Sequence, residues 1–133
     1  LGLLAGEVRP EMVEVVRRCG ERLHTALLTN NVVTMRAEAM AGAPPGDASP
    51  VAEVLALFDV IVESSVVGVR KPEPRFYEIA CERLGIEPSE AVFLDDLGVN
   101  LKPARAMGMT TIKVVDPAAA IAELEQVVGF PLR

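Results

Sequence analysis

Short apolar runs alternate along this sequence with segments that have the spacing of amphipathic helices, and this alternation limits the chain to few folds. The apolar runs cover residues 25–29, 59–63, 91–95 and 110–115. Each run has the length of a strand, and each intervening segment can hold a helix that returns the chain to the same edge of a sheet. Strands joined in this way run parallel and are covered on both faces. The sequence therefore predicts an α/β fold, a three-layer α/β/α sandwich around a mostly parallel sheet.

Proline and glycine mark where the predicted helices begin and end. Proline fits the first turn of a helix, and glycine fits the left-handed residue just after the last turn. The predicted helices cover residues 10–20, 50–58, 73–84, 98–108 and 116–129. The segment 42–50 holds two glycines and three prolines and is predicted to be a surface loop. There is neither an internal repeat nor a linker that divides domains, so residues 1–133 are predicted to form one domain.

Composition excludes several classes of function. The 133 residues carry a formal net charge of −6 and only 4% aromatic side chains, which disfavours binding to nucleic acid. No apolar run reaches the roughly 18 residues of a membrane span, and no signal-like leader is seen, so a cytoplasmic protein is expected. Cys19 and Cys81 fall on apolar helix faces and are predicted to be buried free thiols. The single histidine, His24, excludes two-histidine zinc sites and is expected to have a surface or structural role.

Two adjacent carboxylates follow the apolar run at 91–95. In parallel α/β sheets, ligands bind beyond the carboxyl ends of the strands. Asp95 and Asp96 stand at such an end, with Asn100 one helical turn further on. Neighbouring carboxylates repel each other, and a hard cation such as Mg²⁺ relieves that repulsion. The alternative is that one aspartate caps the following helix while the other is solvated.

Polar residues also follow two other predicted strands. Thr29, Asn30 and Asn31 offer a hydroxyl, two amides and turn N–H groups that can hold phosphate oxygens, although such residues are also common in plain turns. Lys71 precedes Pro72, whose ring stiffens the segment and can aim the ammonium group into a site. The alternative is a solvated surface lysine. No glycine-rich dinucleotide or P-loop motif and no Gly-x-Ser-x-Gly elbow occurs, so nucleotide or flavin binding rests on the predicted architecture alone.

Three short motifs, taken in order, resemble motifs of the haloacid dehalogenase-like (HAD) hydrolase superfamily. Residues 27–30 (Leu-Leu-Thr-Asn), 68–74 (Gly-Val-Arg-Lys-Pro-Glu-Pro) and 92–96 (Val-Phe-Leu-Asp-Asp) look like its second, third and fourth motifs. The longer run 93–105 is similar to the N-terminal phosphatase domain of soluble epoxide hydrolase and to the related domain fused to some acyl-CoA dehydrogenases. The resemblance covers residues from about 9 to 132 and implies a Rossmann-like three-layer core.

This resemblance implies a Mg²⁺-dependent phosphatase that acts on small phosphorylated substrates through an aspartyl-phosphate intermediate. Carried over to this chain, Thr29 and Asn30 would hold phosphate oxygens, and Lys71 would neutralise charge on the transferring phosphoryl group. Asp96, assisted by Asp95, would bind Mg²⁺. These roles make Lys71 and Thr29 catalytic candidates, since positioning and charge stabilisation are the main requirements of phosphoryl transfer.

The family's first motif, Asp-x-Asp, has no counterpart in this chain. Aspartates occur only at positions 47, 59, 95, 96 and 116, and no two have that spacing. The resemblance therefore implies an N-terminally incomplete core that lacks its nucleophile, its first strand and most of its cap. A gap is then expected between the strands at 25–29 and 91–95, with unpaired edges on both sides. The apolar start at residues 1–6 is interpreted as an interior cut.

Three hypotheses accommodate this departure from the family pattern. The first is a HAD-like hydrolase represented by a fragment that lacks its N-terminal third. The second is a catalytically inactive interaction or dimerisation module, in which the sheet pairs again or a second copy fills the gap to give a homodimer. The third is an intact catalyst that takes its nucleophile from elsewhere in the chain, for which Asp59 and Asp47 are poor substitutes.

Overall fold

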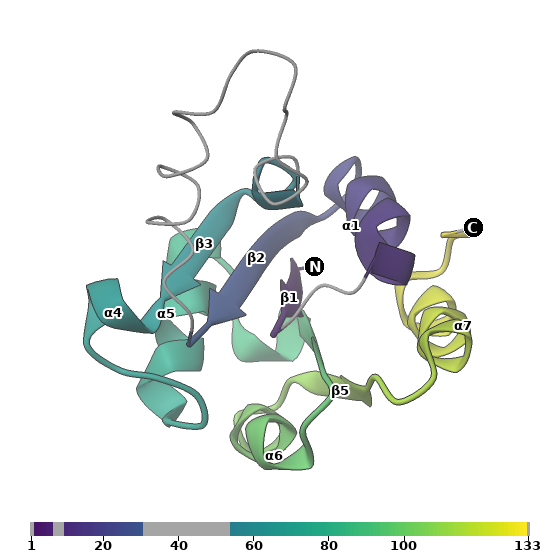
Figure 1. The fold of residues 1–133 in the computed structure, drawn as a ribbon. Coiled ribbons are helices and arrows are strands. Elements are labelled where there is room, and N and C mark those ends of the chain that lie inside the picture. The colour runs from purple at the N-terminus through teal and green to yellow at the C-terminus, as the bar shows by residue number, and fades with distance from the viewer. Residues whose placement is uncertain (1, 7–9, 31–53, 133) are drawn as a thin grey trace.

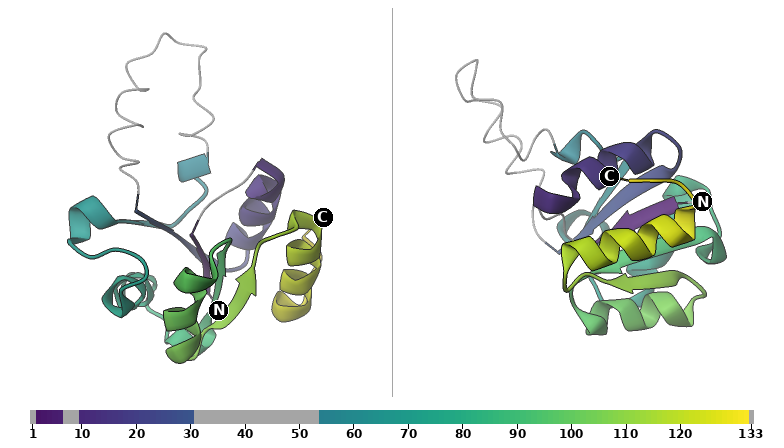
Figure 2. Two further views of the ribbon diagram at one scale, coloured as in Figure 1. Left: turned by 60° about the horizontal axis from the view of Figure 1, so that its bottom comes forward. Right: turned by 90° about the vertical axis from the view of Figure 1, so that its right-hand side faces the viewer.

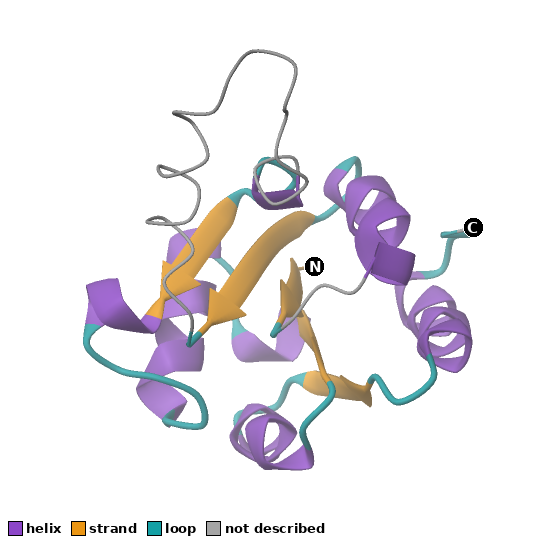
Figure 3. Cartoon of the chain, in the orientation of Figure 1, coloured by secondary structure: helices purple, strands orange, loops and turns teal. Residues whose placement is uncertain are grey.

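Five strands form a single parallel sheet in the computed structural model, which describes residues 2–6, 10–30 and 54–132. The strand order is β3-β2-β1-β4-β5, and every neighbouring pair is parallel (Figure 1, Figure 3). The strands are β1 (Gly2–Ala5), β2 (His24–Thr29), β3 (Val60–Glu63), β4 (Ala91–Asp95) and β5 (Thr110–Lys113). The four strands predicted from the apolar runs are all present, with bounds within two residues of those expected.

Helices cover both faces of the sheet and complete the predicted three-layer sandwich. The helices α1 and α7 pack on one face, and α5 and α6 pack on the other (Figure 2). The helical elements are η1 (Pro10–Met12), α1 (Val13–Gly20), α4 (Ser64–Val67), α5 (Pro74–Leu84), η2 (Pro88–Glu90), α6 (Gly98–Ala106) and α7 (Pro117–Val128). The loop predicted at 42–50 and the first residues of the helix predicted at 50–58 lie outside the described residues. Among the helices described, none is long and apolar enough to cross a membrane.

Alternate residues of the central strands point to opposite faces, and this divides the core into an α5/α6 side and an α1/α7 side. Leu4 of β1 and Phe93 of β4 belong to the cluster beneath α5 and α6, whereas Leu3 belongs to the cluster beneath α1 and α7. Cys81 lies in the first cluster and Cys19 in the second, and both are buried free thiols as predicted. Burial on both faces explains why the central strands β1 and β4 are almost continuously apolar.

The gap expected in the middle of the sheet is not there, and that prediction is wrong. β1 lies between β2 and β4, with Leu3 opposite Thr25 on one side and Val92 on the other. All four residues of β1 are buried. Its backbone N–H and C=O groups can therefore pair on both sides, so the neighbouring strands have no unpaired edge at this place. Because β1 fills this place, there is no missing strand for a second copy to supply, and the reason given for expecting a homodimer no longer holds.

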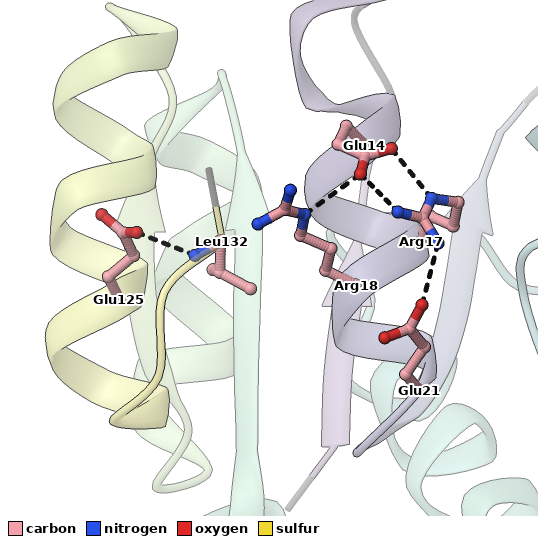
Figure 4. Close-up of polar contacts among 6 residues, drawn as sticks. All are labelled: Glu14, Arg17, Arg18, Glu21, Glu125 and Leu132. Carbon is pink, nitrogen blue, oxygen red and sulfur yellow. Dashed lines mark hydrogen bonds and ion pairs between the residues drawn. The ribbon is translucent and has the colours of Figure 1, made fainter.

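Charged side chains cover the outward face of α1. Arg17 and Arg18 both pair with Glu14 (Figure 4). The end of the described chain turns back beside α7, where the backbone N–H of Leu132 donates to Oε2 of Glu125 at 2.8 Å. Leu132 is fully buried in the same cluster as Cys19, so this segment closes the α1/α7 side of the core.

Candidate functional site

The carboxyl ends of β1, β2 and β4 meet at one edge of the sheet, and the predicted site residues gather there. Thr29 ends β2, Asp95 ends β4, and Gly6 directly follows β1. The loop at 68–73, which connects α4 to α5, brings Lys71 to the same edge. Because the strands are parallel, residues from distant parts of the chain come together at this edge.

Lys71 is the residue that the loop at 68–73 turns inward. It is 6% exposed, whereas every other residue of this loop is exposed or half-buried. Its Nζ donates to the carbonyl oxygen of Gly6 at 2.9 Å and to Oδ2 of Asp95 at 3.2 Å. The alternative of a solvated surface lysine is therefore wrong. The ammonium group lies between the ends of β1 and β4.

Asp95 and Asp96 are adjacent in sequence but differ in their surroundings. Asp95 is 2% exposed. Its Oδ1 accepts the backbone N–H of Leu97 at 3.0 Å, and its Oδ2 accepts Nδ2 of Asn100 at 3.2 Å in addition to Lys71. Three donors, of which Lys71 also carries the opposite charge, compensate the buried carboxylate. Asp96 is half-buried, so it is the aspartate nearer to solvent.

A buried tyrosine supports Asn100 from behind. The hydroxyl of Tyr77 donates to the backbone carbonyl of Asn100 at 2.6 Å, and its ring packs edge-on against Phe93 with centroids 5.2 Å apart. Burial, together with the carboxylate of Asp95, raises the pKa of Tyr77 above its usual value, so the hydroxyl remains a donor at neutral pH. Sequence patterns did not indicate this role, because an aromatic residue at helical spacing is typical of any core-facing helix.

The side chain of Asn30 is bonded to the backbone of Lys71. Oδ1 of Asn30 accepts the N–H of Lys71 at 3.0 Å, and Nδ2 donates to the carbonyl oxygen of Lys71 at 3.3 Å. Thr29, the preceding residue, is 5% exposed at the end of β2. Asn31 lies outside the described residues. The structure therefore brings Thr29 and Asn30 to the edge where Lys71 lies, as predicted.

Gly6 stands where β1 reaches the site, and sequence patterns assigned it no role. A Cβ atom on this residue would lie 1.9 Å from Oδ2 of Asp95 and 3.0 Å from Nζ of Lys71. Only glycine leaves room for this buried ion pair. At the end of the central strand, Lys71 therefore meets a backbone carbonyl, and not the carboxylate that the family's Asp-x-Asp motif would supply. No sequence pattern could show this, because the close approach joins three distant segments.

The remaining aspartates do not supply a carboxylate beside Lys71 within the described residues. Asp59 lies just before β3, at the amino ends of the strands and away from the site. Its Oδ2 accepts the N–H of Thr25 at 2.9 Å. Asp116 precedes α7 and is exposed, and Asp47 lies outside the described residues. Asp59 is therefore a poor substitute for the family's nucleophile, as predicted.

Asp95 and Asp96, at the end of β4, could hold a metal ion only with help from other ligands. In the parts of the chain that the structure describes, no three His, Cys, Asp or Glu side chains gather as a metal site. Mg²⁺ is often bound through one or two carboxylates, with water and phosphate oxygens completing its octahedral shell. Asp96 can offer a carboxylate to such a donor set, whereas both carboxylate oxygens of Asp95 already accept hydrogen bonds.

A family model described as haloacid dehalogenase-like hydrolase matches residues 1–108. This span includes every site residue described above. The chain belongs to the haloacid dehalogenase-like hydrolase family.

Three curated relatives show how this HAD-like chain compares with longer proteins. Acyl-CoA dehydrogenase family member 10 of Mus musculus is 43% identical over 125 residues, which are 94% of this chain and 11% of that protein. Bifunctional epoxide hydrolase 2 of Sus scrofa is 42% identical over 108 residues, 81% of this chain and 19% of that protein. Phosphatase MT3486 of Mycobacterium tuberculosis is 31% identical over 103 residues, 77% of this chain and 42% of that protein. The chain spans less than half the length of each relative.

Solved structures share the fold of this HAD-like chain. An uncharacterized protein from Corynebacterium glutamicum superposes with a TM-score of 0.74 at 18% identity, covering 97% of this chain and 95% of its own. A HAD family enzyme of Bacteroides thetaiotaomicron, bt-2542, in complex with magnesium and inorganic phosphate superposes with a TM-score of 0.61 at 24% identity, covering 80% of this chain and 52% of its own. These likenesses confirm the predicted α/β, Rossmann-like HAD fold.

Proposed function

We propose that this HAD-like chain binds Mg²⁺ and the phosphoryl group of a small phosphorylated substrate at the carboxyl edge of its sheet. The observation that carries the proposal is the buried ammonium group of Lys71, 3.2 Å from Oδ2 of Asp95. Lysine is almost never buried unless it is paired. Here its positive charge lies beside the carboxylate of Asp95, the neighbour in sequence of Asp96, and such a charge stabilises a phosphoryl group with bound Mg²⁺.

Four of the predicted residues have a definite part in this proposal. Asp96, with Asp95, would hold Mg²⁺, which when bound neutralises charge on the phosphoryl oxygens and orients them. The hydroxyl of Thr29 and the ammonium of Lys71 would contact phosphoryl oxygens that the metal does not reach. These are roles of positioning and charge stabilisation.

Hydrolysis through an aspartyl-phosphate needs one further group. An aspartate carboxylate must attack phosphorus and release the alcohol, and water must then cleave the acyl phosphate. Within the described residues, the carboxylate that contacts Lys71 is that of Asp95, and both of its oxygens already accept hydrogen bonds, so it is not free to attack phosphorus. We therefore propose that the 133-residue chain binds phosphate with Mg²⁺ without turnover, and that phosphatase activity belongs to a longer HAD-like hydrolase that supplies the Asp-x-Asp segment.

The second candidate function, a catalytically inactive interaction module, has one observation in its favour. Gly6 leaves the centre of the site to the ion pair of Lys71 and Asp95, and this pair is complete without any ligand. A module of this kind would use the pair only to hold the sheet edge together. It predicts that the chain binds neither phosphate nor Mg²⁺ at this edge.

Calorimetric titration with inorganic phosphate, in the presence and absence of Mg²⁺, separates the two functions. We expect phosphate to bind the 133-residue chain more tightly when Mg²⁺ is present, and Asp96→Asn to remove this effect of Mg²⁺. Asp116→Asn is the matched control, because Asp116 is exposed and makes no side-chain cap bond to α7. A wild-type chain that binds no phosphate, or an Asp96→Asn variant with unchanged Mg²⁺ dependence, would contradict the proposal. Metal-dependent turnover of an aryl phosphate by the 133-residue chain would contradict the proposal that this chain binds phosphate without hydrolysing it.

A further inference from the structure

The side chain of Asn30 connects two parts of the site that lie 41 residues apart in the sequence. Its two polar atoms bond the two backbone groups of a single residue, since Oδ1 accepts the N–H of Lys71 and Nδ2 donates to the carbonyl of Lys71. An amide has one acceptor and one donor group, and Asn30 uses both on the same residue. Its side chain therefore holds the loop at 68–73 to the end of β2.

This attachment determines where the ammonium group of Lys71 can reach. A lysine side chain has a flexible four-carbon stem, so its charged end is positioned only if the backbone below it is fixed. The other backbone hydrogen bonds of this loop, such as those between Arg70 and Glu73 and from Gly68 to Ser64, join residues only three or four positions apart. From the backbone position that Asn30 fixes, Nζ of Lys71 reaches the carbonyl of Gly6 and the carboxylate of Asp95.

We infer that Asn30 is a positioning residue that acts through Lys71, rather than a side-chain ligand of phosphate. Its amide group keeps the backbone of Lys71 at the end of β2. The ammonium group of Lys71 therefore stays in the phosphoryl site even when a bound phosphate weakens its ion pair with Asp95. The part of this inference that concerns phosphate rests on the proposed function. The part that concerns the place of the Lys71 ammonium group does not.

A double-mutant cycle with inorganic phosphate distinguishes positioning from direct contact. We expect Asn30→Ala to weaken phosphate binding on the order of tenfold in the full chain, and to weaken it no further when Lys71 is already Met. Ser64→Ala is the control, because Oγ of Ser64 donates to the backbone oxygen of Asn30 at 3.3 Å without touching its amide group. An equal loss from Asn30→Ala with and without Lys71 would overturn the inference, because the amide would then act on phosphate by itself.

The ammonium resonance of Lys71 tests the inference without phosphate. The chain has three lysines, and Lys102 and Lys113 are exposed, so in lysine-labelled protein only Lys71 should give a protected ammonium signal. We expect Asn30→Ala to shift this signal towards those of the exposed lysines, and Ser64→Ala to leave it in place. An unchanged Lys71 signal in Asn30→Ala would overturn the inference even if phosphate binds. A wild-type chain that shows the Lys71 signal but binds no phosphate would count against the proposed function only.

Discussion

The buried ion pair of Lys71 and Asp95 restricts which residues can occupy the positions around it. Each partner is nearly fully buried, with side chains 5% and 1% exposed. Removing charges from water costs several kcal/mol per ion. That cost is offset only when other donors and acceptors complete the site, as Gly6, Asn100 and the N–H of Leu97 do here. Neighbouring residues are therefore constrained by this pair even when they carry no charge.

Gly6 is the residue at which this constraint can be measured. An added methyl group in Gly6→Ala would lie 1.9 Å from Oδ2 of Asp95, so the carboxylate must move away from Lys71. We expect a loss of roughly 3 kcal/mol in the free energy of unfolding, which is the range for breaking a buried ion pair. Urea unfolding of the two proteins measures this difference.

Gly98→Ala provides the matched control for the glycine substitution. Gly98 begins α6, and a Cβ atom there would meet nothing within 4 Å. Alanine loses less conformational entropy than glycine on folding, so we expect this variant to be more stable by about 0.4–1 kcal/mol. A Gly6→Ala variant as stable as the wild type would show that the carboxylate of Asp95 can move at no cost.

The pairing of charges on α1 predicts how the stability of this helix depends on pH. Hydrogen bonds from Arg17 and Arg18 lower the pKa of Glu14 from 4.5 to about 2. Folding thus favours the ionised carboxyl group, and its stabilising effect is present above about pH 4.5 and lost as the pH falls towards 2. We expect the urea midpoint of Glu14→Gln to fall less than that of the wild type between pH 5 and pH 3.

Salt provides the control for this prediction. The pair is exposed, so its contribution is small and screened by ions. The difference between Glu14→Gln and the wild type should therefore shrink when the same titration is repeated at high salt. Identical pH profiles for the two proteins at low salt would show that the arginines near Glu14 do not stabilise α1.

Elements differed in how well the sequence predicted them. The strands β2 and β4 are recognisable because continuous apolar runs are followed by polar residues at the carboxyl end, as in Thr29 and Asp95. β1 was not predicted, because Gly2–Ala5 is short, lacks β-branched residues and is followed by Gly6. Its place depends on pairing with two strands that come later in the chain. No local pattern carries that information.

The same reasoning applies to the candidate site. Lys71, Asp95 and Thr29 could be predicted because they occupy positions after strands, where parallel sheets place their ligands. The bonds from Asn30 to the backbone of Lys71 and from Tyr77 to Asn100 could not. Each depends on the distance between segments that only the assembled sheet brings together.

In the molecule as a whole, β1 connects the two sides of the core. Leu4 belongs to the cluster beneath α5 and α6, while Leu3 belongs to the cluster beneath α1 and α7. The end of the same strand bonds Lys71 through the carbonyl of Gly6. Loss of β1 would therefore remove packing from both faces and a bond from the site. We expect the two sides to unfold together.

The two buried thiols report on this cooperativity, because they lie on opposite sides of the sheet. Cys19 packs in the α1/α7 cluster and Cys81 in the α5/α6 cluster, and burial raises the pKa of each thiol from 9 to about 11. Both thiols are therefore protonated and shielded at pH 8 and should react with an alkylating reagent only after unfolding. We expect equal labelling rates for the two, since one opening event exposes both. A much faster rate at Cys19 would show that α1 and α7 detach first.

The raised pKa values of Cys19 and Cys81 also predict how the free energy of unfolding changes at alkaline pH. A thiol whose pKa is raised by folding stabilises the folded chain only while it is protonated, so its contribution is complete below about pH 9 and is lost as the pH rises towards 11. We expect the urea midpoint to fall over this range in the wild type, and to fall less in Cys19→Ala and Cys81→Ala. These single variants also assign the two labelling rates, because each retains one thiol. A midpoint that falls equally in all three proteins between pH 9 and 11 would mean that other groups cause the loss.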